Sequence, residues 1–89
     1  MAHRLEMRKH LEKTFEKLAK RDPVQAQAMQ NKLKQILDDP YRFKPLHAPM
    51  QHLRRVHLMG SFVLTYSIRE QDQTVILEDY DHHDNVYQK

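Results

Sequence analysis

The sequence predicts an α+β fold, in which an N-terminal αα-hairpin packs on a small antiparallel β-sheet. Two observations predict this fold class. Apolar residues recur at three- and four-residue steps up to about residue 37, and segments rich in β-branched and aromatic residues follow after residue 53. We expect a single domain over residues 1–89, because domains usually contain about 100–150 residues and a chain this short has one thin core.

The first helix is predicted over residues 3–21. Its periodic positions are Arg4, Arg8, Leu11, Phe15 and Leu18. A second helix is predicted to start at Asp22-Pro23, because aspartate is a favourable N-cap and proline fits the first helical position. Its apolar stripe consists of Val24, Ala28, Leu33, Ile36 and Leu37. Pro40 is expected to end this helix, since the residue before a proline avoids the α region, and the short linker predicts an antiparallel pair.

Three strands are predicted after an irregular connector over residues 41–49. They span residues 53–58, 62–68 and 74–80. The first turn contains Gly60, the single glycine of the chain, where a positive φ is expected, and the second turn lies over residues 70–73. Tight turns predict an antiparallel meander, with the helix pair covering one face.

Charge and composition narrow the function classes. The formal net charge is +3, which favours a polyanionic partner such as nucleic acid or an acidic protein. The absence of cysteine excludes a disulfide framework and a thiolate zinc site. The longest apolar runs are far too short for a membrane span, and no signal peptide is apparent, so a cytoplasmic protein without a membrane partner is expected.

A set of short motifs occurs in a characteristic order. They are the Asp39-Pro40 break, Lys44-Pro45-Leu46, Leu53-Arg54-Arg55-Val56-His57, Gly60-Ser61-Phe62-Val63-Leu64-Thr65-Tyr66 and Asp81-His82-His83-Asp84-Asn85-Val86-Tyr87. In order and spacing the chain resembles the RelE/ParE superfamily of toxin–antitoxin toxins over about residues 10–87. The resemblance implies a microbial toxin held inactive by a partner antitoxin. RelE members cut mRNA in the ribosomal A site, and ParE members poison DNA gyrase.

The chain departs from the family pattern at three places. Family members usually open with a β-strand, whereas residues 2–6 make at best a vestigial one. The arginine that many RelE proteins carry in the central strand falls on Val63, and the arginine of their C-terminal motif falls on His83. Two arginines of the RelE pattern are therefore replaced in this chain.

Metal-independent RNA cleavage needs a base for the attacking 2′-hydroxyl, an acid for the leaving oxygen and positive charge for the phosphorus centre. Histidine suits proton transfer, and arginine suits phosphate. The predicted catalytic residues are therefore Arg55, His57, His83 and Tyr87. The predicted RNA-binding residues are Arg54, Lys9, Lys13, Lys17 and Lys20. Strand alternation is expected to place Arg55 and His57 on one face and Arg54 on the other.

The leading hypothesis is the toxin of a type II pair that cleaves translated mRNA as an endoribonuclease. Its expected partners are an acidic antitoxin, the ribosome and mRNA, with no metal and no small-molecule cofactor. The Asp-His-His run at residues 81–83 is similar to one motif of the DHH phosphoesterases, but the further aspartate motifs of those enzymes are absent. Two alternatives stay open: a ParE-like inhibitor that binds gyrase or another target without hydrolysis, and a degenerate toxin that only binds its antitoxin.

Overall fold

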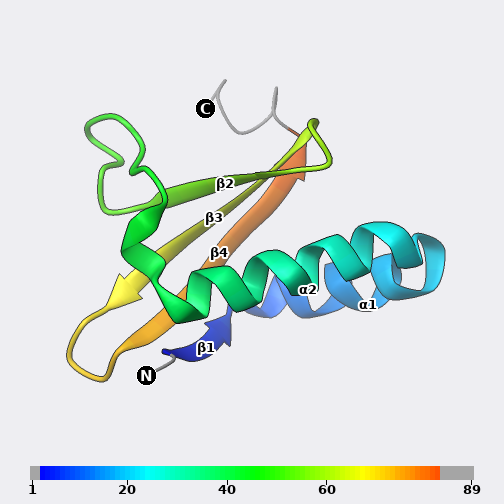
Figure 1. Ribbon diagram of the computed structural model, residues 1–89, viewed down its shortest axis with the longest axis horizontal. Coiled ribbons are helices and arrows are strands. Elements are labelled where there is room, and N and C mark those ends of the chain that lie inside the picture. Colours follow the sequence, from blue (N-terminus) through cyan, green and yellow to red (C-terminus); the bar gives the residue numbers. More distant parts are fainter. Residues whose placement is uncertain (1–2, 83–89) are drawn as a thin grey trace.

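The computed structural model describes residues 3–82, which form two helices and a four-stranded sheet (Figure 1). The helices are α1 (Lys9–Arg21) and α2 (Pro23–Asp38), followed by the short 3₁₀ turn η1 (Pro40–Arg42). The strands are β1 (Arg4–Met7), β2 (Arg54–Leu58), β3 (Phe62–Arg69) and β4 (Thr74–His82). The predicted α+β class, with a helix pair on a small sheet, is confirmed.

The break between the helices forms as the sequence predicts. Asp22 caps α2, and its Oδ1 accepts a hydrogen bond from the backbone N–H of Gln25 at 3.0 Å, while Pro23 occupies the first turn. Asp39 then caps η1 by accepting from the backbone N–H of Tyr41 at 3.1 Å. Both aspartates satisfy N–H groups that have no partner within a helix, which fixes where each element begins.

The predicted start of the first helix is wrong, because residues 4–7 form strand β1 and α1 begins only at Lys9. This strand lies parallel to β4, in a register that pairs Arg4 with Thr74 and Met7 with Leu77. Further backbone bonds at its ends run from the N–H of Arg4 to the carbonyl of Gln73 and from the N–H of Arg8 to the carbonyl of Leu77, each at 3.0 Å. The pairing satisfies backbone groups along the edge of β4, so β1 is a full member of the sheet.

The predicted meander is confirmed, and β1 extends it to the strand order β1-β4-β3-β2. The turn between β2 and β3 places Met59 at φ 55° and Gly60 at φ 75°, so the positive φ expected there extends over two residues. Between β3 and β4, Thr65 pairs with Asp79 but Tyr66 pairs with Leu77. Glu78 is therefore the extra residue of a bulge, and such bulges re-aim side chains locally.

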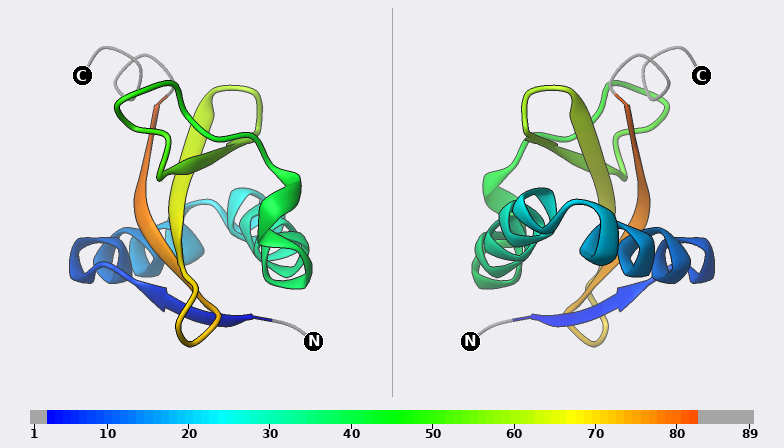
Figure 2. Two further views of the ribbon diagram at one scale, coloured as in Figure 1. Left: turned by 90° about the vertical axis from the view of Figure 1, so that its left-hand side faces the viewer. Right: turned by 90° about the vertical axis from the view of Figure 1, so that its right-hand side faces the viewer.

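The core lies between the helices and one face of the sheet. It is centred on Leu11 of α1, Ile36 of α2 and the strand residues Leu64, Tyr66 and Leu77. Both helices run at an angle to β3 and β4 (Figure 1), and Figure 2 shows β1 and the connector that precedes β2 at opposite ends of the molecule. The helix pair thus covers one face of the sheet, as the sequence predicts.

One member of the predicted apolar stripe of α2 lies outside this core. Val24 is 69% exposed, and the neighbouring Gln25 is buried instead. The side chain of Gln25 accepts a hydrogen bond from the hydroxyl of Tyr80 and donates one to Asp22 at 3.2 Å. These two partners satisfy the buried amide of Gln25, whereas Val24, one residue earlier, lies on the exposed side of α2.

The buried hydroxyl of Tyr66 makes the free energy of unfolding depend on pH in the alkaline range. Its side chain is fully buried, its hydroxyl donates to the carbonyl of Pro40, and burial raises its pKa to about 12. The unfolded chain ionises this phenol near pH 10, so the stabilisation is complete below about pH 10 and is lost as the pH rises toward about 12. We expect Tyr66→Phe to lower the free energy of unfolding by about 1–3 kcal/mol near neutral pH, because the Pro40 carbonyl loses its donor.

Urea unfolding of wild type and Tyr66→Phe at neutral pH and above about pH 11 checks this expectation, because the phenol titrates only in the wild type. The difference between the two proteins should shrink at the higher pH. A difference that stays constant with pH would contradict the assignment.

Candidate functional site

The sheet face that points away from the helices carries polar side chains in two rows, which we call the outer face. In one row, Val63 of β3 pairs with His57 of β2 on one side and with Asp81 of β4 on the other. In the next row, Thr65 of β3 pairs in the same way with Arg55 and Asp79. Paired residues project from the same face, and alternate residues project from opposite faces. Since Val56, Leu58 and Leu64 belong to the core, these six residues lie on the opposite face of the sheet.

Arg55 and His57 lie on the same face of β2, as strand alternation predicts. They are two residues apart on one strand, so their Cα atoms are separated by about 7 Å. The Nη1 of Arg55 donates to the carbonyl of Pro45 at 3.2 Å, which anchors this side chain to the connector before β2. A guanidinium and an imidazole therefore project together from one edge of the sheet.

Arg54 projects from the other face of β2 and holds the connector. Its Nη1 lies 2.6 Å from the carbonyl oxygen of Phe43 and 3.3 Å from that of Tyr41. Its Cζ also lies 5.4 Å from the centre of the Tyr41 ring. These contacts give Arg54 a structural role, and its predicted contact with RNA stays a prediction.

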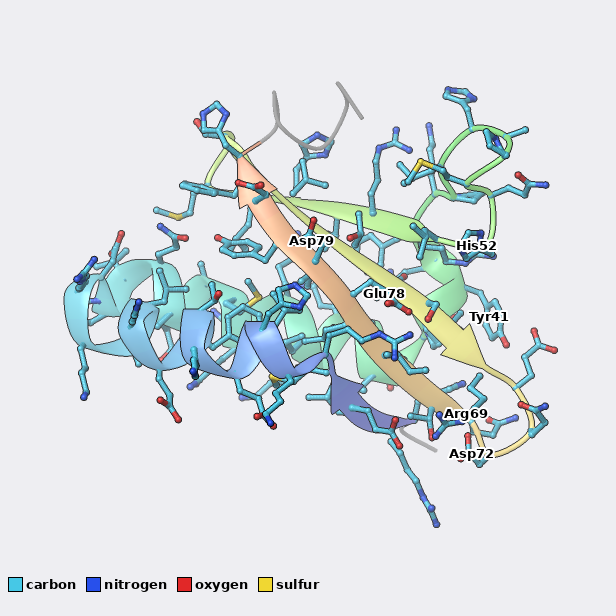
Figure 3. The ribbon with its side chains drawn as sticks, turned by 180° about the vertical axis from the view of Figure 1, so that it is seen from behind. Tyr41, His52, Arg69, Asp72, Glu78 and Asp79 are labelled. Carbon is cyan, nitrogen blue, oxygen red and sulfur yellow. The ribbon has the colours of Figure 1, made fainter. Side chains whose placement is uncertain are left out.

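Strand β4 lines the outer face with carboxylates, which sequence analysis missed. Glu78 and Asp79 follow one another along β4 (Figure 3), and Asp81 lies two residues further on. The Oδ1 of Asp79 lies 3.7 Å from the Nε2 of His10, at the start of α1. The acidic run Glu78-Asp79-Tyr80-Asp81 was the available signal, because alternation places Asp79 and Asp81 on one face.

The bulge residue Glu78 is held in its ionised form. Its Oε1 accepts from the Nε of Arg8 at 2.7 Å, and its Oε2 accepts from the hydroxyl of Ser67 at 2.6 Å. Burial alone would raise the pKa of Glu78, but the hydrogen bonds from Arg8 and Ser67 outweigh it, and the pKa is lowered. The contact also ties the junction of β1 and α1 to β4.

The middle of the outer face, at Val63 and Thr65 of β3, is buried. Val63 is 0% exposed and lies between His57 and Asp81 in its row, at the position where the RelE pattern has arginine. Cationic side chains on β2 and carboxylates on β4 are thus separated by β3, a backbone distance of about 10 Å. The arrangement can hold a phosphate beside β2 with Arg55 and transfer a proton with His57, whereas the β4 side repels anions.

The remaining predicted residues lie either on α1 or outside the described residues. Exposed side chains along α1 include Lys9, Lys13, Lys17 and Lys20. Their spacing places them in one stripe, on the side of α1 opposite the buried Leu11. His83 and Tyr87 lie outside the described residues, so the structure does not place them relative to Arg55 and His57.

Within residues 3–82, no group of three or more His, Cys, Asp or Glu side chains is arranged to hold a metal ion. In the same range, neither helix is long and apolar enough to cross a membrane.

Comparison with known proteins identifies the family. The sequence model described as "ParE toxin of type II toxin-antitoxin system, parDE" matches residues 4–87. This chain belongs to the RelE/ParE toxin superfamily. A relative in Methanocaldococcus jannaschii, whose name places it among the RelE toxins (RelE4), is 39% identical over 87 residues, covering 98% of this chain and 93% of that protein. A second relative, from Methanosarcina mazei, is 49% identical over 83 residues, covering 93% of this chain and 96% of its own length.

Solved structures share the fold of this superfamily toxin. The RelBE2 toxin-antitoxin complex of Mycobacterium tuberculosis matches with a TM-score of 0.75 at 20% identity, over 93% of this chain and 100% of that one. A mutant of E. coli RelE in the free state matches with a TM-score of 0.76 at 20% identity, over 99% of this chain and 93% of that one. The same mutant in complex with a peptide of its antitoxin RelB has a TM-score of 0.73 at 22% identity, with the same coverage. The RelE-like fold is therefore confirmed.

Proposed function

We propose that this RelE/ParE toxin arrests growth by cleaving translated mRNA in the cytoplasm. The observation that carries the proposal is the placement of Arg55 and His57 side by side on the outer face of β2. A relative named as a RelE toxin, 39% identical to this chain, supports the RelE type of activity.

In the proposed reaction the 2′-hydroxyl of RNA attacks the adjacent phosphorus, and the bond from phosphorus to the 5′-oxygen breaks. A base takes the proton of the 2′-hydroxyl and an acid supplies one to the leaving 5′-oxygen. The guanidinium of Arg55 meets two oxygens of the phosphorus centre, because its planar donor pair matches their geometry. His57 transfers a proton, since the ordinary pKa of histidine lies near neutral pH. His83 and Tyr87 remain proposed partners in the same reaction.

We also propose that an acidic antitoxin holds the toxin inactive. A groove of about 190 Å³ between α1 and α2 supports this partner. It is mainly apolar, with Phe15 and Leu18 on one side and Met29 and Leu33 on the other. An amphipathic segment fits such a groove through its apolar face, and the net charge of +3 favours an acidic partner. Structural relatives in complex with an antitoxin add to this support.

Non-hydrolytic inhibition, as in ParE members, is the second candidate. It is favoured by the buried Val63 in place of the central arginine and by the carboxylates of Asp79 and Asp81 across the outer face. Carboxylates at this distance from a phosphate weaken its binding.

Induced expression without the antitoxin separates the two candidates. Growth arrest with mRNA cut within translated regions, mapped by primer extension, supports the endonuclease. Arrest with intact mRNA and lost gyrase supercoiling supports the ParE-type inhibitor. Normal growth on induction would contradict both, and would leave a chain that only binds its antitoxin.

A further inference from the structure

A basic pocket of about 380 Å³ lies at the edge of β2, beside the outer face. It is formed where α2, η1 and the connector before β2 come together. Its basic lining residues come from α2, η1, the connector and β2, and they are Lys32, Arg42, Lys44, Arg55 and His57. Among the described residues, no aspartate or glutamate lines this pocket. As far as residues 3–82 line it, the pocket carries basic side chains alone, whereas the outer face carries both signs of charge.

Among the residues that the structure describes, no carboxylate forms a salt bridge with three of these cations. The salt bridges of the described residues involve Arg8, His10 and Arg69 as the cationic partners. Within residues 3–82, no such pair includes Lys32, Arg42 or Lys44. Cations that converge on a concave surface without counter-charges attract an anion, because their fields add there.

The ring of Phe43 positions two of the cations. The Nζ of Lys32 lies 5.9 Å from the ring centre, and the Cζ of Arg42 lies 5.8 Å from it. Phe43 is half-buried and packs against the core, so the ring is itself fixed. Contacts of this kind orient a cation and leave its positive charge available. Lys32 and Arg42 are therefore held in position before a ligand binds.

We propose that this pocket binds a phosphodiester of single-stranded RNA next to the bond that is cleaved, an inference that rests on the proposed endonuclease function. Arg55 and His57 line the pocket and also belong to the outer face, so a strand that meets them continues over the β2 edge into the pocket. The guanidinium of Arg42 and the ammonium groups of Lys32 and Lys44 then contact flanking phosphates. The substrate therefore binds at the β2 edge of the sheet, away from the carboxylates of β4.

The test measures binding of a fluorescent 2′-O-methyl oligoribonucleotide, which cannot be cleaved because its 2′-oxygen carries no proton. The variant combines Lys32→Ala, Arg42→Ala and Lys44→Ala. A matched control with the same loss of charge combines Arg4→Ala, Arg21→Ala and Lys34→Ala, whose exposed side chains lie outside the pocket. Each phosphate contact to a single strand contributes about 0.7 to the slope of log K against log salt concentration, so the pocket variant should lose about 2 units of slope. Its affinity at low salt should fall by about tenfold or more.

The control should keep most of the wild-type slope and affinity. Equal losses in the two triple variants, or no binding by wild type, would overturn the proposal. It would also be overturned if the pocket variant bound the strand normally and instead lost an acidic protein that copurifies with wild type, because the pocket would then dock a protein. A different result would contradict the endonuclease proposal alone. In that case the wild type would bind the strand through the pocket, but mRNA in cells would stay intact.

Discussion

Replacing Arg55 by alanine is expected to lower the rate of ribosome-dependent mRNA cleavage by about 10²-fold or more. A guanidinium that meets the developing charge at phosphorus contributes about 3–4 kcal/mol to the transition state. Val63 stands where the RelE pattern has an arginine, so no arginine at that position of β3 shares this role with Arg55. Single-turnover cleavage on programmed ribosomes measures the effect on chemistry, separately from binding.

Two companion variants sharpen this measurement. Arg55→Lys should restore only part of the rate, because an ammonium group is a point charge without the paired donors of guanidinium. Arg4→Ala is the matched control, since Arg4 is an exposed arginine of β1, at the opposite edge of the sheet. A folded Arg55→Ala protein that cleaves as fast as wild type would remove Arg55 from the reaction.

Replacing Ile36 by alanine is expected to lower the free energy of unfolding by about 2–5 kcal/mol. Ile36 is 0% exposed and packs in the core between α2 and the sheet. Truncation removes buried methylene and methyl groups and leaves a cavity that a close-packed interior fills only in part. In a domain whose whole stability is about 5–15 kcal/mol, this is a large share.

Urea denaturation followed by circular dichroism measures this loss. Val24→Ala is the control from the same helix, because Val24 is 69% exposed and should change stability by no more than about 0.5 kcal/mol. Equal effects of the two substitutions would contradict the position of the core described above.

Elements whose signals are local were predictable from the sequence. The Asp22-Pro23 pair determines the start of α2, and the helix stops at Asp38 before Pro40. The strands of the meander were predicted to within two residues at each end, because β-branched and aromatic runs alternate with turn residues. In each case the residues that determine the element lie inside it or next to it.

Strand β1 was not predictable in this way. Residues 4–7 continue the spacing of α1, so the periodicity extends the helix backwards through Arg4. What makes them a strand is the edge of β4, some seventy positions further along the chain. Sequence periodicity carries no information about such a distant partner.

The candidate site was likewise predictable only where its signal lies within one element. Alternation along β2 was enough to place Arg55 and His57 on one face. The contacts of Arg54 with two carbonyl oxygens depend on the path of an irregular connector, which has no periodic signal. The basic pocket likewise forms only when Lys32 of α2 is brought beside Arg42 and Lys44, so its members are scattered in the sequence.

The parallel pairing of β1 with β4 has a consequence for synthesis of the protein. A nascent chain can form the helix pair and then the β2–β3 hairpin as soon as these local segments leave the ribosome. It cannot place β1 until Thr74–Leu77 has been made, because those residues are its hydrogen-bonding partners. The row residues Asp79 and Asp81 follow later still on the same strand. The sheet therefore closes only after Thr74–Leu77 has left the ribosome, so a product that terminates before these residues lacks the paired β1 and the finished outer face.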